Sequence, residues 1–227
     1  MIKRYVILIK DHFIFDMDGV LIDSEPAHQQ IFKKVFEELN LEFSLSYHHT
    51  LVGMAAVPMW EKIRSDFNIQ TNARELMNFH KEFMYVAIKE LDIQVVPDVL
   101  PLLDRLQEMG IKMSLASSSA EKLIQHFVDK FNIRSKFDFL VSGESLTRSK
   151  PYPDIFLKVA DLYNKKPDHF IVVEDSNNGV RAAKAAQMTC LGYNNPNSGQ
   201  QDLSQADAIV SSFAQLNQEK LKQLTGV

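Results

Sequence analysis

The sequence predicts an α/β fold, in which a Rossmann-like core with a parallel sheet carries a helical insertion after its first strand. Two observations predict the core: short apolar runs alternate with amphipathic segments along most of the chain, and those segments have the helical period. A third predicts the insertion. Residues 27–91 break the alternation, because they carry successive helical patterns and little strand signal.

The elements follow from these patterns in chain order. The first strand, Phe13–Asp16, is an apolar run that ends in a carboxylate. Inserted helices are predicted at Ala27–Leu39, Val57–Phe67 and Ala73–Leu91. Later strands are predicted at Lys112–Ser117, Phe139–Ser142, Phe170–Asp175, Thr189–Tyr193 and Ala208–Val210. The core helices are predicted at Val99–Met109, Ala120–Phe131, Pro153–Tyr163 and Val180–Gln187. The predicted division is therefore 1–24 for the first strand and an N-terminal extension, 25–93 for the insertion and 94–227 for the rest of the core.

Composition limits the classes of partner and compartment. A chain of 227 residues can form one large domain or one domain with a modest insertion. Its formal net charge of −4 gives no electrostatic reason to expect nucleic acid or an anionic membrane as a partner. The single cysteine, Cys190, fits a reducing compartment, and the apolar stretch Tyr5–Ile9 is too short for a signal peptide. No apolar run has the length of a membrane span. We therefore expect a cytoplasmic protein that acts on a small molecule; the oligomeric state stays open and a monomer is compatible with the composition.

Polar side chains collect where the predicted strands end. In open parallel sheets, ligands bind outside the carboxyl ends of the strands. Clustered carboxylates repel one another unless a cation lies among them, and oxygen ligands without His or Cys favour Mg²⁺ over zinc. The groups that we expect to meet at this edge are Asp16, Asp18, Ser117, Lys150, Glu174 and Asp175.

Each of these features also has an ordinary structural explanation when it is taken alone. Asp16 and Asp18 can be strand-end and turn residues, Ser117 a helix cap and Lys150 a solvated lysine. Their joint presence favours a functional site. A calcium loop is excluded, because the glycine of the segment that starts at Asp16 is its fourth residue rather than its sixth.

Ser118, which is followed three residues later by Glu121, has the spacing of a capping box. It predicts that the helix ending at Phe131 begins at this point. Ser117 and the neighbouring backbone N–H groups would then lie at a helix N-terminus, which is a ready site for an anion. Gly19 frees the backbone to turn after the second acid.

Four segments occur along the chain in the order "DMDGVLIDSEPAH", "SLASSS", "RSKPYPDIF" and "VVEDSNNGVRAAKAA". In this order and spacing they resemble the four motifs of the haloacid dehalogenase-like hydrolase superfamily, in the branch that contains β-phosphoglucomutase and small sugar-phosphate phosphatases. The resemblance covers roughly residues 12–193. All four motifs together are specific, whereas the first pair of acids alone would be a weak signal.

The resemblance implies a chemistry for these residues. Asp16 would be the nucleophile that forms an aspartyl phosphate, and the Asp18 side chain would act as general acid and then as general base. Ser117 and Lys150 would bind the phosphoryl group and neutralise its charge. Dehalogenase chemistry is disfavoured, because it has no use for Asp18. The implied Mg²⁺ ligands are Asp16, Asp18 through its backbone carbonyl, Glu174 less securely, and Asp175.

The same resemblance identifies the insertion at 25–93 as a mobile cap domain. It implies that the substrate is bound by His28, Gly53, Ser118 and Ser119. Caps of β-phosphoglucomutase relatives often carry an arginine just after this glycine that grips a second phosphate, whereas the segment 54–57, "MAAV", provides no cation. We therefore expect a Mg²⁺-dependent phosphatase of a small phosphorylated metabolite, such as a sugar phosphate. A β-phosphoglucomutase-type mutase is the alternative.

Two further hypotheses are less favoured, namely a non-catalytic binding protein and a metal site formed by histidines. A non-catalytic binding protein of the same fold would have no need of the complete set of acids, serine and lysine. His48, His49 and His80 have no spacing that is typical of a metal site, so we expect solvated or structural roles for them.

Overall fold

The computed structural model describes residues 9–52, 54, 56–88 and 90–227. Its core is a six-stranded sheet in the order β5-β4-β1-β6-β7-β8, in which each pair of neighbours is parallel. The strands are β1 (His12–Phe15), β4 (Lys112–Ser117), β5 (Phe139–Ser142), β6 (Phe170–Glu174), β7 (Thr189–Tyr193) and β8 (Ala208–Val210). Each predicted strand is therefore present within one residue of its predicted bounds, and the predicted α/β fold is confirmed.

The sheet order places β1 at a central position, between β4 and β6. Phe15 at the end of β1 lies opposite Leu115 on β4 and Val173 on β6. The backbone N–H of Asp16 donates to the carbonyl of Val173 at 3.0 Å, which ties the end of β1 to β6. Because the three strands are parallel and in register, the residues that follow them meet at one edge of the sheet.

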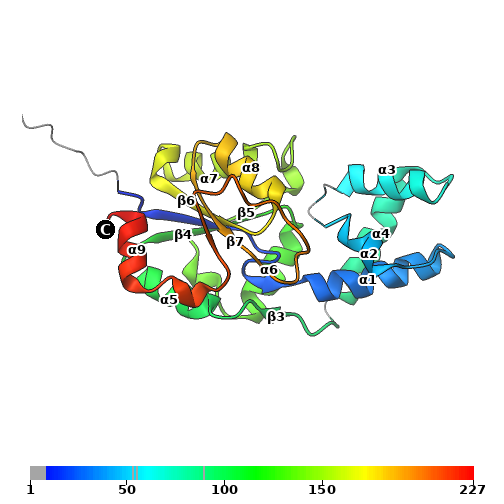
Figure 1. The fold of residues 1–227 in the computed structure, drawn as a ribbon, viewed down its shortest axis with the longest axis horizontal. Coiled ribbons are helices and arrows are strands. Elements are labelled where there is room, and N and C mark those ends of the chain that lie inside the picture. Colours follow the sequence, from blue (N-terminus) through cyan, green and yellow to red (C-terminus); the bar gives the residue numbers. More distant parts are fainter. Residues whose placement is uncertain (1–8, 53, 55, 89) are drawn as a thin grey trace, which may run out of the picture.

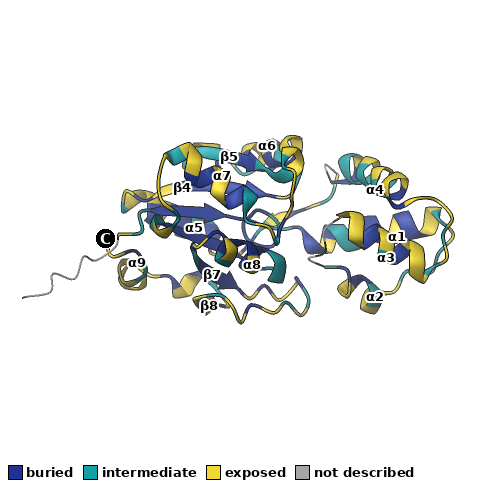
Figure 2. Ribbon diagram, turned by 90° about the horizontal axis from the view of Figure 1, so that it is seen from above, coloured by how far each residue is buried: buried dark blue, intermediate teal, exposed yellow. Residues whose placement is uncertain are grey.

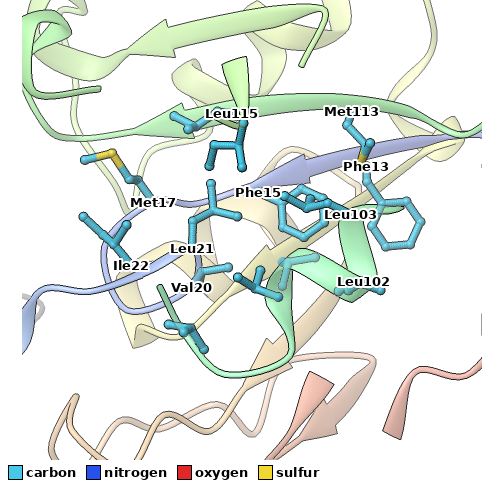
Figure 3. Close-up of a cluster of buried hydrophobic side chains, with 14 of the residues drawn as sticks. Phe13, Phe15, Met17, Val20, Leu21, Ile22, Leu102, Leu103, Met113 and Leu115 are labelled. Carbon is cyan, nitrogen blue, oxygen red and sulfur yellow. The ribbon is translucent and has the colours of Figure 1, made fainter. Parts of the chain in front are cut away.

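Helices cover both faces of this sheet (Figure 2). Successive strand side chains point to opposite faces, so the complete burial of Phe13, Ile14 and Phe15 requires cover on both. Phe13 and Phe15 pack with Leu102 and Leu103 on one face, as Figure 3 shows. Ile14 belongs to a second apolar cluster on the other face. The core helices are α5 (Val99–Glu108) and α6 (Glu121–Lys130) on the first face, α7 (Asp154–Tyr163) and α8 (Asn177–Ala185) on the second, and α9 (Gln218–Thr225).

The chain ends close to where β1 begins (Figure 1). The backbone N–H of Lys10 donates to the carbonyl of Thr225 in α9 at 2.8 Å, so residues next to both ends of the described chain lie side by side. Short 3₁₀ helices complete the connections at Arg134–Lys136, Gly143–Ser145, Pro167–His169 and Phe213–Gln215.

The insertion forms a group of helices beyond the carboxyl edge of the sheet, at the right of Figure 1. Its apolar residues make a third cluster, in which Phe36, Trp60 and Ile63 are fully or almost fully buried. The chain leaves and re-enters the core through two short antiparallel strands, β2 (Ile22–Asp23) and β3 (Gln94–Val95). The inserted helices are α1 (Glu25–Glu38), α2 (Leu45–His49), α3 (Ala56–Asp66) and α4 (Ala73–Ala87).

Helix starts differ from the prediction where a side chain or a proline sets the first turn. Helix α1 starts at Glu25, because Pro26 is accepted in the first turn, where its missing N–H costs nothing. Helix α8 starts at Asn177, because the Ser176 hydroxyl accepts the N–H of Gly179 and caps the helix. The predicted bounds were defined by the spacing of apolar residues, and neither a proline nor a capping serine contributes to that spacing.

The capping box predicted at Ser118 and Glu121 is wrong. Helix α6 has Ala120 as its N-cap residue, with no side-chain cap. The Ser117 hydroxyl accepts the N–H of Ser119 at 3.0 Å, and the Ser119 hydroxyl is turned to Asp18. The serine segment is therefore held in a turn before the helix, and the helix starts after it.

Candidate active site

A buried ion cluster lies at the carboxyl edge of β1 and β6. The Lys150 ammonium donates to Asp16 Oδ1 and to Glu174 Oε1, at 2.6 Å in both cases. It also lies 3.4 Å from the carbonyl oxygen of Ala116, at the end of β4. Burial opposes the charge of Lys150, but the two carboxylates outweigh it and raise its pKa. Lys150, which is far from Asp16 in sequence, is thus a fixed cation beside the first acid.

Three carboxylates, from Asp16, Glu174 and Asp175, place one oxygen each within 4.8 Å of one another. Burial raises the pKa of Asp16 to about 7, because Lys150 only partly offsets burial and the repulsion from Glu174 and Asp18. Burial, followed by repulsion from Glu174 and Asp16, raises the pKa of Asp175 well above its usual value. The lysine alone does not balance the cluster.

This donor set fits a hard divalent cation. Buried carboxylates whose charge is not balanced gain most from such an ion, and all three offer oxygen, the ligand that Mg²⁺ prefers. Backbone closely surrounds the cluster: a Cβ on Gly19 would lie 1.9 Å from Asp175 Oδ2, and the φ of this glycine is +75°. Only glycine therefore fits at this turn.

The Asp18 side chain is not one of the three clustered carboxylates and is held by serine hydroxyls instead. Its oxygens accept hydrogen bonds from the hydroxyls of Ser24, at 2.8 Å, and Ser119, at 2.7 Å; Ser117 lies at 3.4 Å. Any ligand that Asp18 gives to a metal in the cluster would therefore come from its backbone carbonyl, as the resemblance implies.

The charge of Asp18 is set by its neighbours. Burial acts to raise its pKa, but the hydrogen bonds and the His28 ring outweigh burial and lower the pKa to about 2. His28 Nε2 lies 3.8 Å from Asp18 Oδ1. Burial acts to lower the pKa of His28, and Asp18 and Glu25 outweigh it and raise this pKa. Each of the two side chains therefore favours the charged form of the other, and both line the cavity.

These groups line one cavity of about 720 Å³ between the sheet edge and the inserted helices. Asp16, Asp18, Lys150, Glu174 and Asp175 line its floor. The predicted substrate contacts His28, Ser118 and Ser119 line its wall, as does Ser117, and Gly53 lies outside the described residues. The structure thus brings together all the predicted site residues that it describes.

An ion pair crosses from the insertion to the core beside this cavity. The ammonium of Lys81 on α4 donates to the carboxylate of Glu144, and both residues line the cavity. This pairing raises the pKa of Lys81, because the hydrogen bond from Lys81 to Glu144 favours its charged form. Lys81 is therefore a cation that already has an anion.

Several contributors have no signal in the sequence. The Ser198 hydroxyl, in the loop after β7, donates to Asp175 Oδ2. The Ser176 N–H and hydroxyl both donate to Glu174 Oε2, at 3.1 and 3.0 Å, while Lys150 binds its other oxygen. Ser24 holds Asp18. Each makes its contact only after distant segments have come together, so sequence spacing cannot reveal it.

Comparison with known proteins assigns the family. The family model described as "Haloacid dehalogenase-like hydrolase" matches residues 13–193. The chain belongs to this family. The matched segment contains all four motifs and all the predicted site residues. No helix in the described part of the chain has both the length and the apolar character needed to cross a membrane.

Individual relatives include phosphatases and a mutase. The chain is 31% identical over 176 residues to a "Phosphorylated carbohydrates phosphatase" from Thermotoga maritima, covering 76% of this chain and 80% of the relative. It is 30% identical over 217 residues to the β-phosphoglucomutase of Bacillus subtilis, covering 92% of both. The structure of a β-phosphoglucomutase from Clostridium difficile has the same fold, with a TM-score of 0.79, 24% identity and coverage of 95% and 97%.

Proposed function

We propose that this protein is a Mg²⁺-dependent phosphatase that removes phosphate from a small phosphorylated sugar or polyol through an aspartyl phosphate on Asp16. The observation that carries the proposal is the placement of Asp16. Its carboxylate is bound by Lys150, adjoins two further buried carboxylates that suit a divalent cation, and lines a cavity whose wall carries the Asp18–His28 pair. Related phosphatases and mutases support the same substrate class.

In the first half-reaction, Asp16 attacks phosphorus while the ester oxygen leaves. Lys150 holds Oδ1 of Asp16 and thereby orients the other oxygen toward the cavity. The Ser117 hydroxyl, which lies 3.4 Å from Asp18, would turn its proton to a phosphoryl oxygen, while the Ser119 hydroxyl keeps its hydrogen bond to Asp18. The leaving oxygen takes its proton from the Asp18–His28 pair, in which Asp18 favours the protonated form of His28. A bound Mg²⁺ would neutralise phosphoryl charge among Asp16, Glu174 and Asp175.

In the second half-reaction, water attacks the phosphorus of the aspartyl phosphate. Asp18, which is ionised, takes the proton of this water and passes it to His28, which restores the proton given up in the first half-reaction. The bond between phosphorus and Asp16 breaks, inorganic phosphate is released and the Asp16 carboxylate is regenerated. Each step asks the chain for positioning and charge balance, which is what phosphoryl transfer chiefly requires.

Hydrolysis is favoured over a mutase reaction by the charges in the cavity. A mutase must hold a bisphosphate in two orientations, so it needs a cation for the distal phosphate. Met54, Ala56 and Val57 line the cavity where such a cation is expected, and Lys81 is already paired with Glu144. We infer also that residues 25–93 act as a cap domain whose closure excludes water from the site.

The test supplies β-glucose 1-phosphate with a catalytic amount of the 1,6-bisphosphate and Mg²⁺, beside a panel of other sugar phosphates. We expect free phosphate from at least one of these substrates and no rapid formation of glucose 6-phosphate. Glucose 6-phosphate that appears faster than phosphate would establish the mutase instead. Absence of both products across the panel would contradict the proposed enzyme.

A further inference from the structure

The cavity continues from the ion cluster into the inserted helices. The part of the cavity among these helices, which we call its upper part, is lined by Glu25 and Phe32 from α1, His48 from α2 and His80 from α4. His48 is 3% exposed, and His80 and Glu25 are 9% exposed. His48 and His80 have no part in the transfer steps described above, and Glu25 enters them only through the pKa of His28.

Three polar atoms in this upper part have no hydrogen-bond partner among the described residues: His48 Nδ1, His80 Nε2 and Glu25 Oε1. His48 Nδ1 and Glu25 Oε1 lie 3.4 Å apart, beyond the usual length of a hydrogen bond. Leaving buried polar atoms unpaired costs folding free energy, and native proteins pair nearly all of them. Three such atoms, in residues that line one cavity, mark groups that a ligand can pair when these side chains turn toward it.

The arrangement of the two imidazoles suits a ligand with both apolar and hydroxyl groups. Both rings pack against Phe32, at centroid distances of 4.9 Å for His48 and 4.5 Å for His80. Phe32 and Met59 add apolar wall to the same part of the cavity. Sugars and sugar alcohols present C–H faces to such a wall and hydroxyls to the polar atoms beside it.

The charge of this part of the cavity argues against a second phosphate. Burial, and then repulsion from charged His28, lowers the pKa of His48 to about 4 and that of His80 to about 3, so both rings are neutral at pH 7. Burial raises the pKa of Glu25 to about 7. Neutral imidazoles and a carboxyl group both donate to and accept from hydroxyls, whereas a phosphate dianion needs cations.

We propose that Glu25, His48 and His80 form a hydroxyl-recognition subsite, which selects an uncharged polyol chain carrying a single phosphate. A hydroxyl that lies beside this pair, within hydrogen-bond distance of both His48 Nδ1 and Glu25 Oε1, would donate to one and accept from the other. A second hydroxyl pairs with His80 Nε2. The inference rests on the proposed phosphatase function and adds to it the residues that determine specificity.

The experiment compares glucitol 6-phosphate with p-nitrophenyl phosphate, which has no hydroxyl groups beyond its phosphate. The variants are His48→Leu and His80→Leu, which remove the polar atoms, and His48→Asn and His80→Gln, which place an amide near Nδ1 and Nε2. His49→Leu is the matched control, because His49 is the exposed neighbour of His48. The readouts are the ratio of kcat/KM for the two substrates and the Tm.

We expect each leucine variant to lower the ratio of kcat/KM by about 100-fold, since a site built for a hydroxyl discriminates strongly through it. The amide variants should recover at least about 10-fold of that loss, and His49→Leu should keep the wild-type ratio. The Tm of the leucine variants should not fall, because an unpaired buried polar atom is removed.

Other results overturn the inference. An unchanged ratio, or a lower Tm with equal loss on both substrates, would assign these histidines a structural role. If the wild type hydrolyses p-nitrophenyl phosphate and none of a panel of sugar and sugar-alcohol phosphates, the subsite is contradicted while the phosphatase function stands. A wild type that releases phosphate from neither class of substrate contradicts the proposed function itself.

Discussion

Asp16 shares its buried position with a lysine and two other acids, so its substitution separates chemistry from folding. Asp16→Asn keeps the side-chain volume and removes the attacking charge. We expect turnover below about a thousandth of the wild-type value, as for other catalytic groups that act as a unit, with a cooperative unfolding transition retained. Phosphate release and thermal unfolding measure the two effects. Asp129→Asn, at an exposed position on α6, is the control. Wild-type turnover by Asp16→Asn would remove this residue from the nucleophilic role.

The pKa of His80 gives a pH dependence of stability. Burial, and then the charges of His28 and His48, lowers this pKa to about 3, against about 6.5 in the unfolded chain. Below pH 6.5 the unfolded chain binds a proton that the folded protein does not. The free energy of unfolding therefore decreases as the pH is lowered below about 6.5, by up to about 1.4 kcal/mol per pH unit from this group.

We expect His80→Leu to reduce this slope between about pH 6.5 and pH 4 and to leave it unchanged above pH 7. His48 contributes with the same sign and Glu25, whose pKa is raised to about 7, with the opposite sign, and both remain in the variant. Urea unfolding at a series of pH values measures the slope, and His49→Leu is the exposed control. Equal slopes for wild type and His80→Leu would show that His80 titrates normally.

At the scale of single elements, the close approach of α8 to the end of β6 holds Glu174 in place. A Cβ on Gly179 would lie 1.8 Å from Glu174 Cδ, so Gly179→Ala must displace either the helix or the carboxylate. We expect a loss of stability of about 1–3 kcal/mol, as in other overpacked sites, and a loss of activity of at least about 10-fold through the disturbed ion cluster.

Gly110→Ala is the matched control for this substitution. Gly110 has a φ of +73° and nothing within 4 Å of an added Cβ, so alanine there costs backbone strain alone. Its activity should remain at the wild-type level while its Tm falls. Chemical denaturation and phosphate release compare the two variants, and an equal activity loss in both would contradict the role given to the α8 approach.

The elements that the sequence predicts well are those whose signal is local. The strands are continuous apolar runs such as Phe170–Glu174, and their positions along the chain follow from the pattern. Helix α2 has five residues and strands β2 and β3 have two each, which is too few for a hydrophobic period to be visible. The capping box at Ser118 failed because the helix starts later, with Ala120 as its N-cap residue, and the spacing alone cannot show this.

The site follows the same division. Asp16, Asp18 and Ser117 were predictable, because each lies at or just after the end of a strand that is visible in the sequence, and the four motifs add Lys150. Ser198 and Ser24 were not, because their partners are fixed only by the assembled sheet edge. The histidines of the insertion resembled ordinary structural residues for the same reason: only the cavity reveals that His48 and His80 converge.

At the scale of the whole molecule, the proposed metal site joins segments from across the sequence. Its three carboxylates come from the ends of β1 and β6, and the Gly19 turn, Ser198 and α8 pack around them. The unfolded chain cannot hold these groups together. A metal that binds only the folded protein therefore stabilises the entire fold, by about 2.7 kcal/mol at a concentration of 100 times Kd.

We expect Mg²⁺ to raise the Tm by roughly 5–10 °C at such a concentration, given about 2–4 °C per kcal/mol for a chain of this size. Removal of metal by chelation should abolish phosphate release reversibly. Calcium should give a Tm shift and little turnover, because its looser coordination misplaces the phosphoryl group.

Asp175→Asn should have a Tm that does not respond to Mg²⁺. In the metal-free state this variant should be at least as stable as the wild type, because it loses the repulsion that raises the pKa of Asp175. Differential scanning calorimetry with and without metal measures both quantities. A Tm that is independent of Mg²⁺, with full turnover after exhaustive chelation, would show that the three carboxylates are held by Lys150 alone.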